Sequence, residues 1–464
     1  MDTLELKKIW NEKYKIVPQQ LEKIRGINTA ATAFNANIDA VLKISGQRLA
    51  ELIKQENLTL EELEDVKQAK ILTPKDVIKG IFKCFVNGIA EEWISEEEQV
   101  YLWMKDNLGY DRLQMGGQGG IVANVLAVSG VKNVIVHANS LPAIQAEQFV
   151  KQDNLVSFDE NGELKPAWQI NRVNDIPLIH WIIEFNRHDT LTVDGKVFRC
   201  PKSNRFIATY DPLNLKLVAD SHFMNHMKNC ATDYVVLSGF HALTANNNGV
   251  ALIKNMSEKI VEWKKNSPQS IFHLEIASTQ DMDIRRAIIE YIAPLMDSMG
   301  INERETIDVL EAIGEEKLAA RSRRQTTSEN LFAGLVKIKE KTGVPRIQLH
   351  MFGLYVILQD TGFKITPQMN LNGMMTAATI AAAKAATGKV DDLLWAQGRA
   401  VSDVGLIEAE SLADAAGQGD LAQTGIGRYR NWDLIVVPTI LIENPITLVG
   451  MGDTISSLSL VAAR

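Results

Sequence analysis

Short apolar runs alternate with segments of helical spacing along this chain, and this alternation limits the fold more than any other feature. Each run has the length of a buried strand, and the segments between the runs are long enough for helices. Such alternation is typical of an α/β protein in which helices cover both faces of a mostly parallel sheet. Ligands of such folds bind at the carboxyl ends of the strands. The runs lie at residues 28–34, 134–138, 234–239, 271–277, 346–350 and 434–442.

Residues 160–210 follow a different pattern. Short apolar segments are separated there by turn residues such as Asp194 and Gly195, which predicts a meander of antiparallel strands. Because 464 residues are many for one hydrophobic core, we interpret this meander as part of a small β-rich lid inserted into a large α/β domain. We expect the lid approximately at residues 15–45, 75–118 and 165–212, and the large domain at 46–74, 119–164 and 213–464.

Charge and composition argue against several classes of partner. The net charge is −8 and no long basic run occurs, so we expect neither nucleic acid nor an anionic membrane as the main ligand. No run reaches the roughly 18 apolar residues of a membrane span. The charged start of the chain lacks the apolar segment of a secretory signal. Three widely spaced cysteines predict neither a zinc site nor a disulfide framework, which fits the cytoplasm.

The stretch from Gly450 to Ser457 carries the clearest sign of chemistry. It follows the apolar run at 434–442 and leads into small and apolar residues typical of a helix. Free N–H groups and the helix dipole form an anion site at such a turn, and Gly450 and Gly452 let the backbone approach a phosphate. A carboxylate at Asp453 then suits a general base beside a phosphate. The alternative is that Asp453 only caps the helix.

Two further segments combine small and polar residues. Residues 116–120, with Gln118 among four glycines, precede a helix of small residues, which allows a polar ligand to approach the helix N-terminus. The alternative is a tight turn with close helix packing. Asn35, Asn37 and Asp39 alternate, so in an extended chain they point the same way and can bond sugar hydroxyls. The alternative there is an Asx-rich loop.

Two acidic motifs suggest a divalent cation. One contains His273 and Glu275, and the other contains Asn302, Glu303 and Glu305. Carboxylates and an amide near a phosphate site suit Mg²⁺, often through water molecules, because Mg²⁺ keeps much of its hydration shell. The alternative for the second motif is that its glutamates are solvated residues in the first turn of a helix.

Taken in chain order, these motifs resemble those of the ADP-dependent sugar kinases of archaea, a family within the ribokinase-like superfamily. The resemblance covers essentially the whole chain. It implies a ribokinase-like, three-layer α/β/α large domain that binds the nucleotide, together with a small β-rich lid. Family members use ADP as the phosphoryl donor and release AMP. The motifs that carry the resemblance lie at residues 35–39, 116–120, 273–275, 302–305 and 449–454.

The resemblance also implies roles for individual positions. Asp453 corresponds to the aspartate that takes the proton from the sugar hydroxyl, and Gly450 and Gly452 correspond to the anion hole for the transferred phosphoryl. The residues implied to position Mg²⁺ are Glu275, Glu305 and, in support, Asn302. Those implied to contact the sugar are Asn37, Asp39, Gly116, Gly117, Gln118 and His180. Those implied to contact the nucleotide are His350, Gly425, Gly427, Thr447 and Val449.

The family divides into enzymes that use fructose 6-phosphate, glucose or both. A phosphorylated acceptor needs cations on the lid, and residues 200–206 resemble the phosphate-contact stretch of the family. Lys202 stands where arginine is more usual, so a point charge replaces a bidentate contact. The alternative is that these cations are surface residues of a hairpin. The candidates are Lys202, Asn204 and Arg205, with Arg187 and Arg199 close by in the sequence.

A glutamate distinguishes the glucose-using members, and residues 87–93 resemble the place where it stands, so Glu91, or Glu92 beside it, is the candidate. We therefore expect transfer of the β-phosphoryl of ADP to the 1-hydroxyl of fructose 6-phosphate in a modified glycolysis, with glucose as a second acceptor. The alternatives are an ADP-dependent glucokinase, an ATP-using relative, and a silent sugar-binding sensor, which should have lost the base or the metal motifs. We expect only small-molecule substrates as partners, and a monomer or small homo-oligomer.

Overall fold

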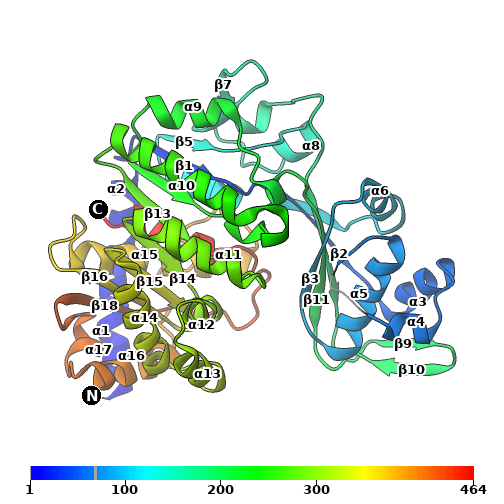
Figure 1. Ribbon diagram of the computed structural model, residues 1–464. Helices are drawn as coiled ribbons and strands as arrows, with labels where there is room; N and C mark the ends of the chain where they lie inside the picture. The colour runs from blue at the N-terminus through cyan, green and yellow to red at the C-terminus, as the bar shows by residue number, and fades with distance from the viewer. Residues whose placement is uncertain (1, 67–69) are drawn as a thin grey trace.

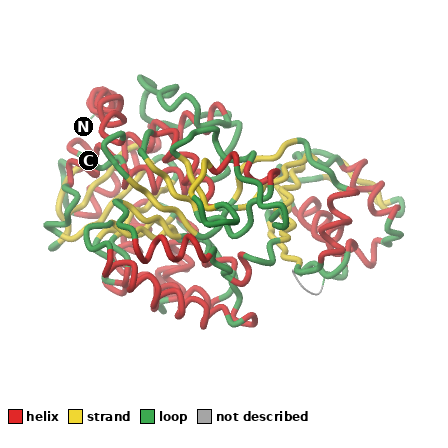
Figure 2. The backbone as a smooth tube through the Cα atoms, turned by 90° about the horizontal axis from the view of Figure 1, so that it is seen from above, coloured by secondary structure: helices red, strands yellow, loops and turns green. Residues whose placement is uncertain are grey.

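Two β-sheets divide the chain into two lobes (Figure 1). The structure is a computed structural model and describes residues 2–66 and 70–464. The large lobe contains an 11-stranded sheet, and the small lobe contains a five-stranded sheet and a two-stranded hairpin. Figure 2, seen from above, shows strands and loops rather than helices running between the lobes. The chain crosses between the lobes at residues 34–36, 117, 170–178 and 211–213.

The centre of the large sheet is parallel, as the alternation of apolar runs predicts. β1 pairs in parallel with β5 and β12, and the parallel series continues from β12 to β15. β16 is antiparallel to both β15 and β18, so β18 points the same way as β15. In sheet order the strands are β17 (Ile426–Tyr429), β18 (Trp432–Pro438), β16 (Leu354–Asp360), β15 (Arg346–Met351), β14 (Ser298–Ile301), β13 (Ile271–Glu275), β12 (Tyr234–Leu237), β1 (Thr29–Ala33), β5 (Asn133–Val136), β6 (Leu155–Phe158) and β7 (Leu164–Pro166).

Helices cover both faces of this sheet, because its central strands are apolar on both sides. In β12, Val235 and Leu237 join one buried cluster, whereas Tyr234 and Val236 join another on the opposite face. The predicted α/β class is therefore confirmed. The first face is covered by α9 (Ser221–Asn229), α10 (Gly249–Asn266), α11 (Met282–Ala287), α12 (Glu303–Ala312), α13 (Glu316–Arg324), α14 (Ser328–Thr342), α16 (Asp403–Ala416) and α17 (Leu421–Thr424). The second face is covered by α1 (Thr3–Lys13), α2 (Val17–Ile24), α7 (Gln118–Ser129), α8 (Ala143–Ala146), α15 (Pro367–Thr387) and α18 (Met451–Val461).

The small lobe is a sheet with helices on one face only. Its apolar core includes Trp93, Trp181 and Phe206, which lie between the sheet and the helices. Side chains alternate along a strand, so the opposite face of the sheet is turned toward the large lobe and carries polar residues. The strands are β3 (Glu91–Ser95), β11 (Asn204–Tyr210), β8 (Ile179–Phe185), β2 (Asn37–Lys43) and β4 (Arg112–Gly116) in sheet order, with the hairpin β9 (Thr190–Val193) and β10 (Lys196–Arg199). The helices are α3 (Gly46–Gln55), α4 (Leu60–Glu64), α5 (Pro74–Asn87) and α6 (Glu98–Asn107).

The predicted meander agrees with this lobe, since β8 and β11 are antiparallel and the β9–β10 hairpin lies between them in sequence. The predicted boundaries differ from the structure in three segments. Residues 46–66 pack in the small-lobe core, not the large one, because Leu49, Leu52 and Ile53 face that core. Conversely, residues 15–33 and 165–170 belong to the large lobe, where β1 is a central strand. Within the expected range 46–74, residues 67–69 lie outside the described part of the chain.

Among residues 2–66 and 70–464, no helix combines the length and the apolar character that crossing a bilayer requires.

Candidate active site

The glycine turn that precedes α18 forms the centre of the site. Gly450 is the N-cap of α18, with a positive φ of 62° and no capping side chain. The N–H groups of the first turn of a helix have no partner within the helix, and here they stand beside the buried carboxyl of Asp453. The strand β18 ends at Pro438, so a loop separates the apolar run from this turn. Because Gly450 caps the helix, the alternative that Asp453 is the N-cap is wrong.

A second helix N-terminus meets the first at Asp453. Gln118, the first residue of α7, donates from Nε2 to Oδ1 of Asp453 across 2.9 Å, and its Oε1 accepts from the N–H of Gly239 at 3.3 Å. Burial raises the pKa of Asp453, while the hydrogen bond from Gln118 and the charge of Lys384 act in the opposite direction. Lys384, a single lysine within a run of alanines, was not among the predicted site residues.

Two buried carboxylates and one imidazole gather next to this turn. Ligand atoms of Glu275, Glu305 and His350 lie within 4.8 Å of one another. Burial, together with the charges of Asp453 and Glu305, raises the pKa of Glu275 well above its ordinary value. Burial likewise raises the pKa of Glu305. Buried carboxylates that repel one another are stabilised by a cation, so the donor set suits a divalent metal ion.

His350 lies beside the two buried glutamates. Nε2 of His350 lies 3.7 Å from Oε1 of Glu275, and a side chain added at Gly452 would meet this nitrogen. Neither ring nitrogen has a hydrogen-bond partner. Burial lowers the pKa of His350 to about 4, so the ring is neutral at pH 7 and faces the acidic cluster as a potential ligand.

The Asn302 motif combines both of its sequence interpretations. Asn302 Oδ1 accepts from the N–H of Glu305 at 2.9 Å, and Oε2 of Glu305 accepts from the N–H of Asn302 at 2.8 Å. This capping box begins α12, as the alternative predicted, but Glu305 is buried rather than solvated. Asn302 therefore fixes the orientation of Glu305. Glu303 turns away and accepts from the N–H of Phe352.

His273 is fully buried and structural. Its Nδ1 lies 2.9 Å from Oγ of Ser298, and its Nε2 lies 2.8 Å from Oγ of Ser456 in α18. The same Nε2 is 3.4 Å from Oε2 of Glu275. His273 therefore links β13 and β14 to the helix that carries Asp453.

On the small lobe, Asn37 and Asp39 lie together at the start of β2. Nδ2 of Asn37 donates to Oδ1 of Asp39 at 3.2 Å. A Cβ atom at Gly116, which pairs with Asn37 across the sheet, would collide with both side chains. The glycine thus leaves room for them, and Asn35 instead accepts from Asn214. Burial raises the pKa of Asp39 to about 6.

His180 extends this polar face on the neighbouring strand. It pairs with Asp39 across β2 and β8 and with Thr209 across β8 and β11, so the three side chains share one face of the sheet. Nε2 of His180 lies 3.2 Å from Oδ2 of Asp211. Asp211 was not predicted, although it directly follows the strand at 204–210.

The strand register decides between the two candidate glutamates. Glu92 pairs with Ile207, and Oγ1 of Thr209 donates to Oε1 of Glu92 at 2.6 Å. Glu91 points to the opposite face, where it forms an ion pair with Lys83 at 2.8 Å. Of the two candidates, Glu92 therefore faces the cleft and Glu91 does not. Trp93 lies in the core two positions after Glu91. Because side chains alternate along a strand, Glu91 lies on the same side as Trp93 and Glu92 lies on the other side.

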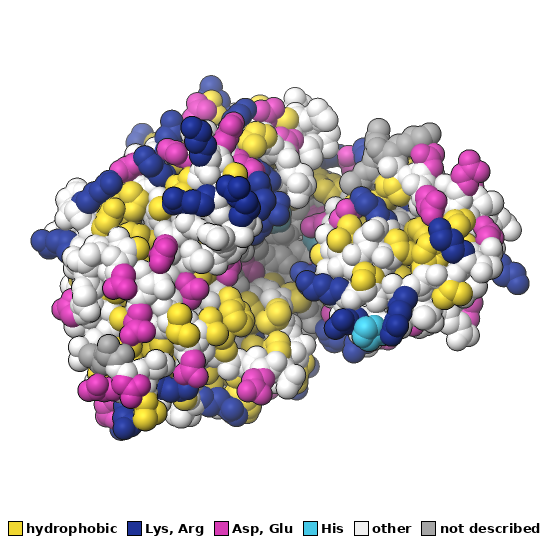
Figure 3. Space-filling model, turned by 90° about the horizontal axis from the view of Figure 1, so that it is seen from below, with side chains coloured by type: hydrophobic (Ala, Val, Ile, Leu, Met, Phe, Trp, Pro, Cys, Tyr) yellow, Lys and Arg dark blue, Asp and Glu magenta, His cyan; other side chains and the backbone are white. Residues whose placement is uncertain are grey.

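The cations expected to bind a phosphate lie on the small lobe. Arg205 shares the cleft-facing side of β11 with Thr209, since side chains alternate along a strand. Asn204 points to the other side and donates to the carbonyl of Gly88 at 3.0 Å, so its contact is structural. Within residues 2–66 and 70–464, neither Lys202 nor Arg205 takes part in an ion pair. Desolvation, followed by the charges of Arg199 and Arg187, lowers the pKa of His188. Figure 3 shows the hollow between the lobes and Lys and Arg side chains on the small-lobe rim beside it.

The remaining nucleotide candidates are dispersed. A Cβ at Gly425 would meet Trp10 and Leu371, so this glycine allows close packing of the core. Gly427 lies against Leu421 and Gln418. Thr447 and Val449 line a cavity of about 260 Å³ that also reaches Lys384. Both glycines thus lie against side chains of the protein itself.

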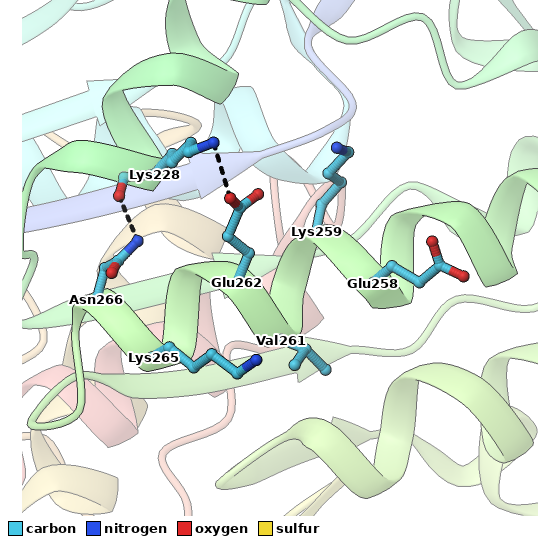
Figure 4. Close-up of a pocket in the computed structure, with 7 residues that line it drawn as sticks. All are labelled: Lys228, Glu258, Lys259, Val261, Glu262, Lys265 and Asn266. Carbon is cyan, nitrogen blue, oxygen red and sulfur yellow. Dashed lines mark hydrogen bonds and ion pairs between the residues drawn. The ribbon is translucent and has the colours of Figure 1, made fainter.

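A second, larger hollow lies far from these groups along the sequence. It has a volume of about 540 Å³ and lies on α9 and α10 (Figure 4). Two of its charged residues, Lys228 and Glu262, form an ion pair at 2.9 Å. It therefore offers no convergent set of reactive groups.

Comparison with known proteins agrees with this geometry. The chain is 27% identical to an ADP-specific phosphofructokinase of Methanosarcina acetivorans, over 93% of this chain and 92% of that protein. It is 30% identical to an ADP-dependent glucose/glucosamine kinase of Pyrococcus furiosus, over 97% of this chain and 98% of that protein. A solved ADP-dependent kinase in complex with fructose-6-phosphate and ADPβS superposes with a TM-score of 0.82 at 27% identity, over 100% of this chain and 98% of that chain.

The family comparison covers nearly the whole chain. The ADP-specific phosphofructokinase/glucokinase conserved region matches residues 28–462, which include both lobes and every motif of the site. The chain therefore belongs to the ADP-specific phosphofructokinase/glucokinase family.

Proposed function

We propose that this protein transfers the β-phosphoryl of ADP to the 1-hydroxyl of fructose 6-phosphate, with glucose as a second acceptor. The observation that carries the proposal is the position of Asp453. Its carboxylate lies at the N-terminus of α18 and accepts a hydrogen bond from Gln118. Gln118 follows Gly116 by two residues, and the side chains of Asn37 and Asp39 pack against Gly116. A base, an anion-binding turn and the polar side chains of Asn37 and Asp39, which can bond hydroxyls, are thus adjacent.

The chemistry follows from these positions. The carboxylate of Asp453 takes the proton of the acceptor hydroxyl as the hydroxyl oxygen forms a bond to the β-phosphorus. The bond from this phosphorus to the bridging oxygen breaks, and the electron pair leaves with AMP. The N–H groups at the start of α18 stabilise the charge on the transferred phosphoryl oxygens. Closure of the small lobe over the substrates would exclude water from the donor.

Glu275 and Glu305 are the residues that we propose to hold Mg²⁺, directly or through water, with Asn302 fixing Glu305. The ion supplies neutralisation of the ADP phosphates when it is bound. His350 adds a neutral nitrogen donor beside them.

The choice of acceptor rests on two features of the small lobe. Arg205, on the cleft-facing side of β11, and Lys202, in the preceding loop, supply charge for a sugar phosphate. Glu92, on the same face as Thr209 and His180, supplies an acceptor for a glucose hydroxyl. Both features are present, which supports the use of two acceptors.

A two-by-two assay tests the proposal, with ADP or ATP as donor and fructose 6-phosphate or glucose as acceptor in Mg²⁺ buffer. We expect turnover with ADP and fructose 6-phosphate, and slower turnover with ADP and glucose. Turnover with ATP alone would overturn the donor assignment. Absence of turnover in all four reactions, with sugar binding retained, would favour a sugar-binding sensor. The grouping of Asp453, Glu275 and Glu305 argues against that second candidate.

A further inference from the structure

A buried lysine stands behind the glycine turn. Lys384 lies near the end of α15, where its neighbours Ala383 and Ala385 are buried, and only 9% of its own surface is exposed. The helix packs against α18, which carries Asp453. Lysine is almost never this buried without partners, so the groups around its ammonium explain its position.

Two acceptors hold the ammonium of Lys384. Its Nζ donates to the carbonyl of Gly450 at 3.1 Å and to Oγ1 of Thr454 at 3.0 Å. The hydroxyl of Thr454 donates to the same carbonyl at 2.7 Å. Gly450 is the residue whose positive φ begins the turn. The lysine therefore fixes the orientation of the peptide group after Gly450, and with it the direction of the N–H groups in the first turn of α18.

The charge of Lys384 also acts on the site. Burial lowers the pKa of Lys384 to about 8, and the negative charges of Asp453 and Asp39 counteract part of this effect. In return, Lys384 lowers the pKa of Asp453. No salt bridge within 4.0 Å joins Lys384 to an acid among the described residues, so the ammonium remains a source of positive charge next to the anion turn.

We propose that Lys384 is a positioning residue for phosphoryl transfer, which anchors the glycine turn through Gly450 and Thr454 and adds positive charge behind the transferred phosphoryl. This inference rests on the proposed function of the same site. Lys384 acts through the turn and not by contact with the reacting atoms. Its removal should slow the chemical step while sugar binding remains intact.

The cavity beside Lys384 provides a matched control. The cavity has a volume of about 260 Å³, and Lys384, Lys389 and Glu147 line it. Lys389 is exposed and is not bonded to the turn. The charged groups that face Lys384 are thus Asp453 from α18, Asp39 from β2, and Glu147 and Lys389 across the cavity.

The test compares Lys384→Met, Lys384→Arg and Lys389→Met with the parent enzyme. Methionine keeps the length and packing of the side chain, so a merely structural lysine would be replaced with little effect. We expect Lys384→Met to lower kcat about 100-fold, to leave the KM for the sugar within about threefold, and to move the acidic limb of the pH profile upward. Lys384→Arg should recover most of kcat, and Lys389→Met should change nothing. A parent-like kcat and acidic limb in Lys384→Met would overturn the inference.

Two further measurements test the role of Lys384 if the first comparison fails. If Lys384→Met does not fold, the alkaline limb of kcat/KM, which reports the free enzyme, decides: it should lie near pH 8 in the parent and move upward in Lys384→Arg, and an unmoved limb would refute the role. Titration of the protein with inorganic phosphate does not depend on the substrates. We expect Lys384→Met to bind phosphate at least about tenfold more weakly, and equal affinity would refute the anchoring role. Failure of the proposed function would appear instead as inactive parent enzyme.

Discussion

Nε2 of Gln118 and Oδ1 of Asp453 are 2.9 Å apart, which joins the first residue of α7 to the first turn of α18. The two residues are 335 positions apart in the sequence. Because the carboxylate accepts this hydrogen bond in its ionised form, Gln118 favours the state in which Asp453 can take a proton. The relative position of the N-termini of α7 and α18 therefore influences the pKa of Asp453.

Gln118→Leu should therefore reduce the fraction of Asp453 that is ionised and able to take a proton. Loss of the donor raises the pKa of Asp453 further, because the hydrogen bond from Gln118 holds it down. The acidic limb of kcat should move to higher pH, and kcat should fall more at pH 6 than at pH 8. A pH–rate profile measures this. A uniform loss at every pH would show that Gln118 only orients substrate.

Asp453→Ala should lower kcat by several orders of magnitude and leave sugar binding nearly intact. Activity within about tenfold of the parent, a difference of only ~1.4 kcal/mol, would refute the base assignment.

A matched variant, Asp453→Asn, tests how the ionisation of Asp453 affects the stability of the fold. Because burial raises the pKa of Asp453 in the folded state, the ionised folded state is disfavoured, and stability falls as pH rises through the window between the unfolded and folded pKa values. Asp453→Asn should therefore have a higher Tm than the parent at neutral pH.

Glu92→Gln and Glu91→Gln should separate specificity from stability. Glu92 faces the cleft with Thr209, so its loss should lower kcat/KM for glucose about tenfold or more. Glu91→Gln breaks the ion pair with Lys83 and should lower Tm slightly without changing the preference between sugars. Steady-state kinetics on both sugars, with thermal melts, measures this. The opposite pattern would restore Glu91 as the sugar contact.

The double variant Lys202→Ala/Arg205→Ala should raise the KM for fructose 6-phosphate about tenfold or more and leave the KM for glucose unchanged. Only the phosphorylated sugar needs these charges. Lys196→Ala is a suitable control, because Lys196 is an exposed cation of the same lobe that pairs with Glu64 at 3.5 Å. Equal losses on both sugars would instead indicate damage to the small lobe.

Addition of Mg²⁺ to metal-free protein should raise Tm, since a ligand at 100 times its Kd stabilises by about 2.7 kcal/mol. Glu275→Gln should remove this response, because Glu275 belongs to the buried cluster. Glu303→Gln should keep it, because Glu303 bonds the backbone of Phe352 and lies outside that cluster. A Tm response that survives in Glu275→Gln would place the ion elsewhere.

The sequence predicted the class of fold and the grouping of the motifs for the same reason: parallel strands present their carboxyl ends at one edge. Glu275, at the end of β13, and His350, in β15, therefore meet at the edge that α18 also reaches. The glycines before Asp453 likewise predicted the start of a helix, although the sequence left open whether Asp453 caps that helix or lies in its first turn.

Other features depended on tertiary packing. The pairing of β3 with β11 places Glu92 beside Thr209, and no local pattern in the sequence indicates which strand β3 pairs with. The helices at 46–64 have the same spacing whether they cover the large sheet or the small one, so only their contacts with the small core assign them. Lys384 was missed because its partners, a carbonyl and a hydroxyl, carry no charge pattern that the sequence could reveal.

Gly117 alone separates β4 of the small lobe from α7 of the large one. Gly116 on one side cradles Asn37 and Asp39, and Gln118 on the other side holds Asp453. Three consecutive residues thus connect the polar side chains of β2 with the hydrogen-bond partner of Asp453. The separation between the side chains of Asn37 and Asp39 and the residue that holds Asp453 is therefore set by one glycine, Gly117, whose φ is 71°.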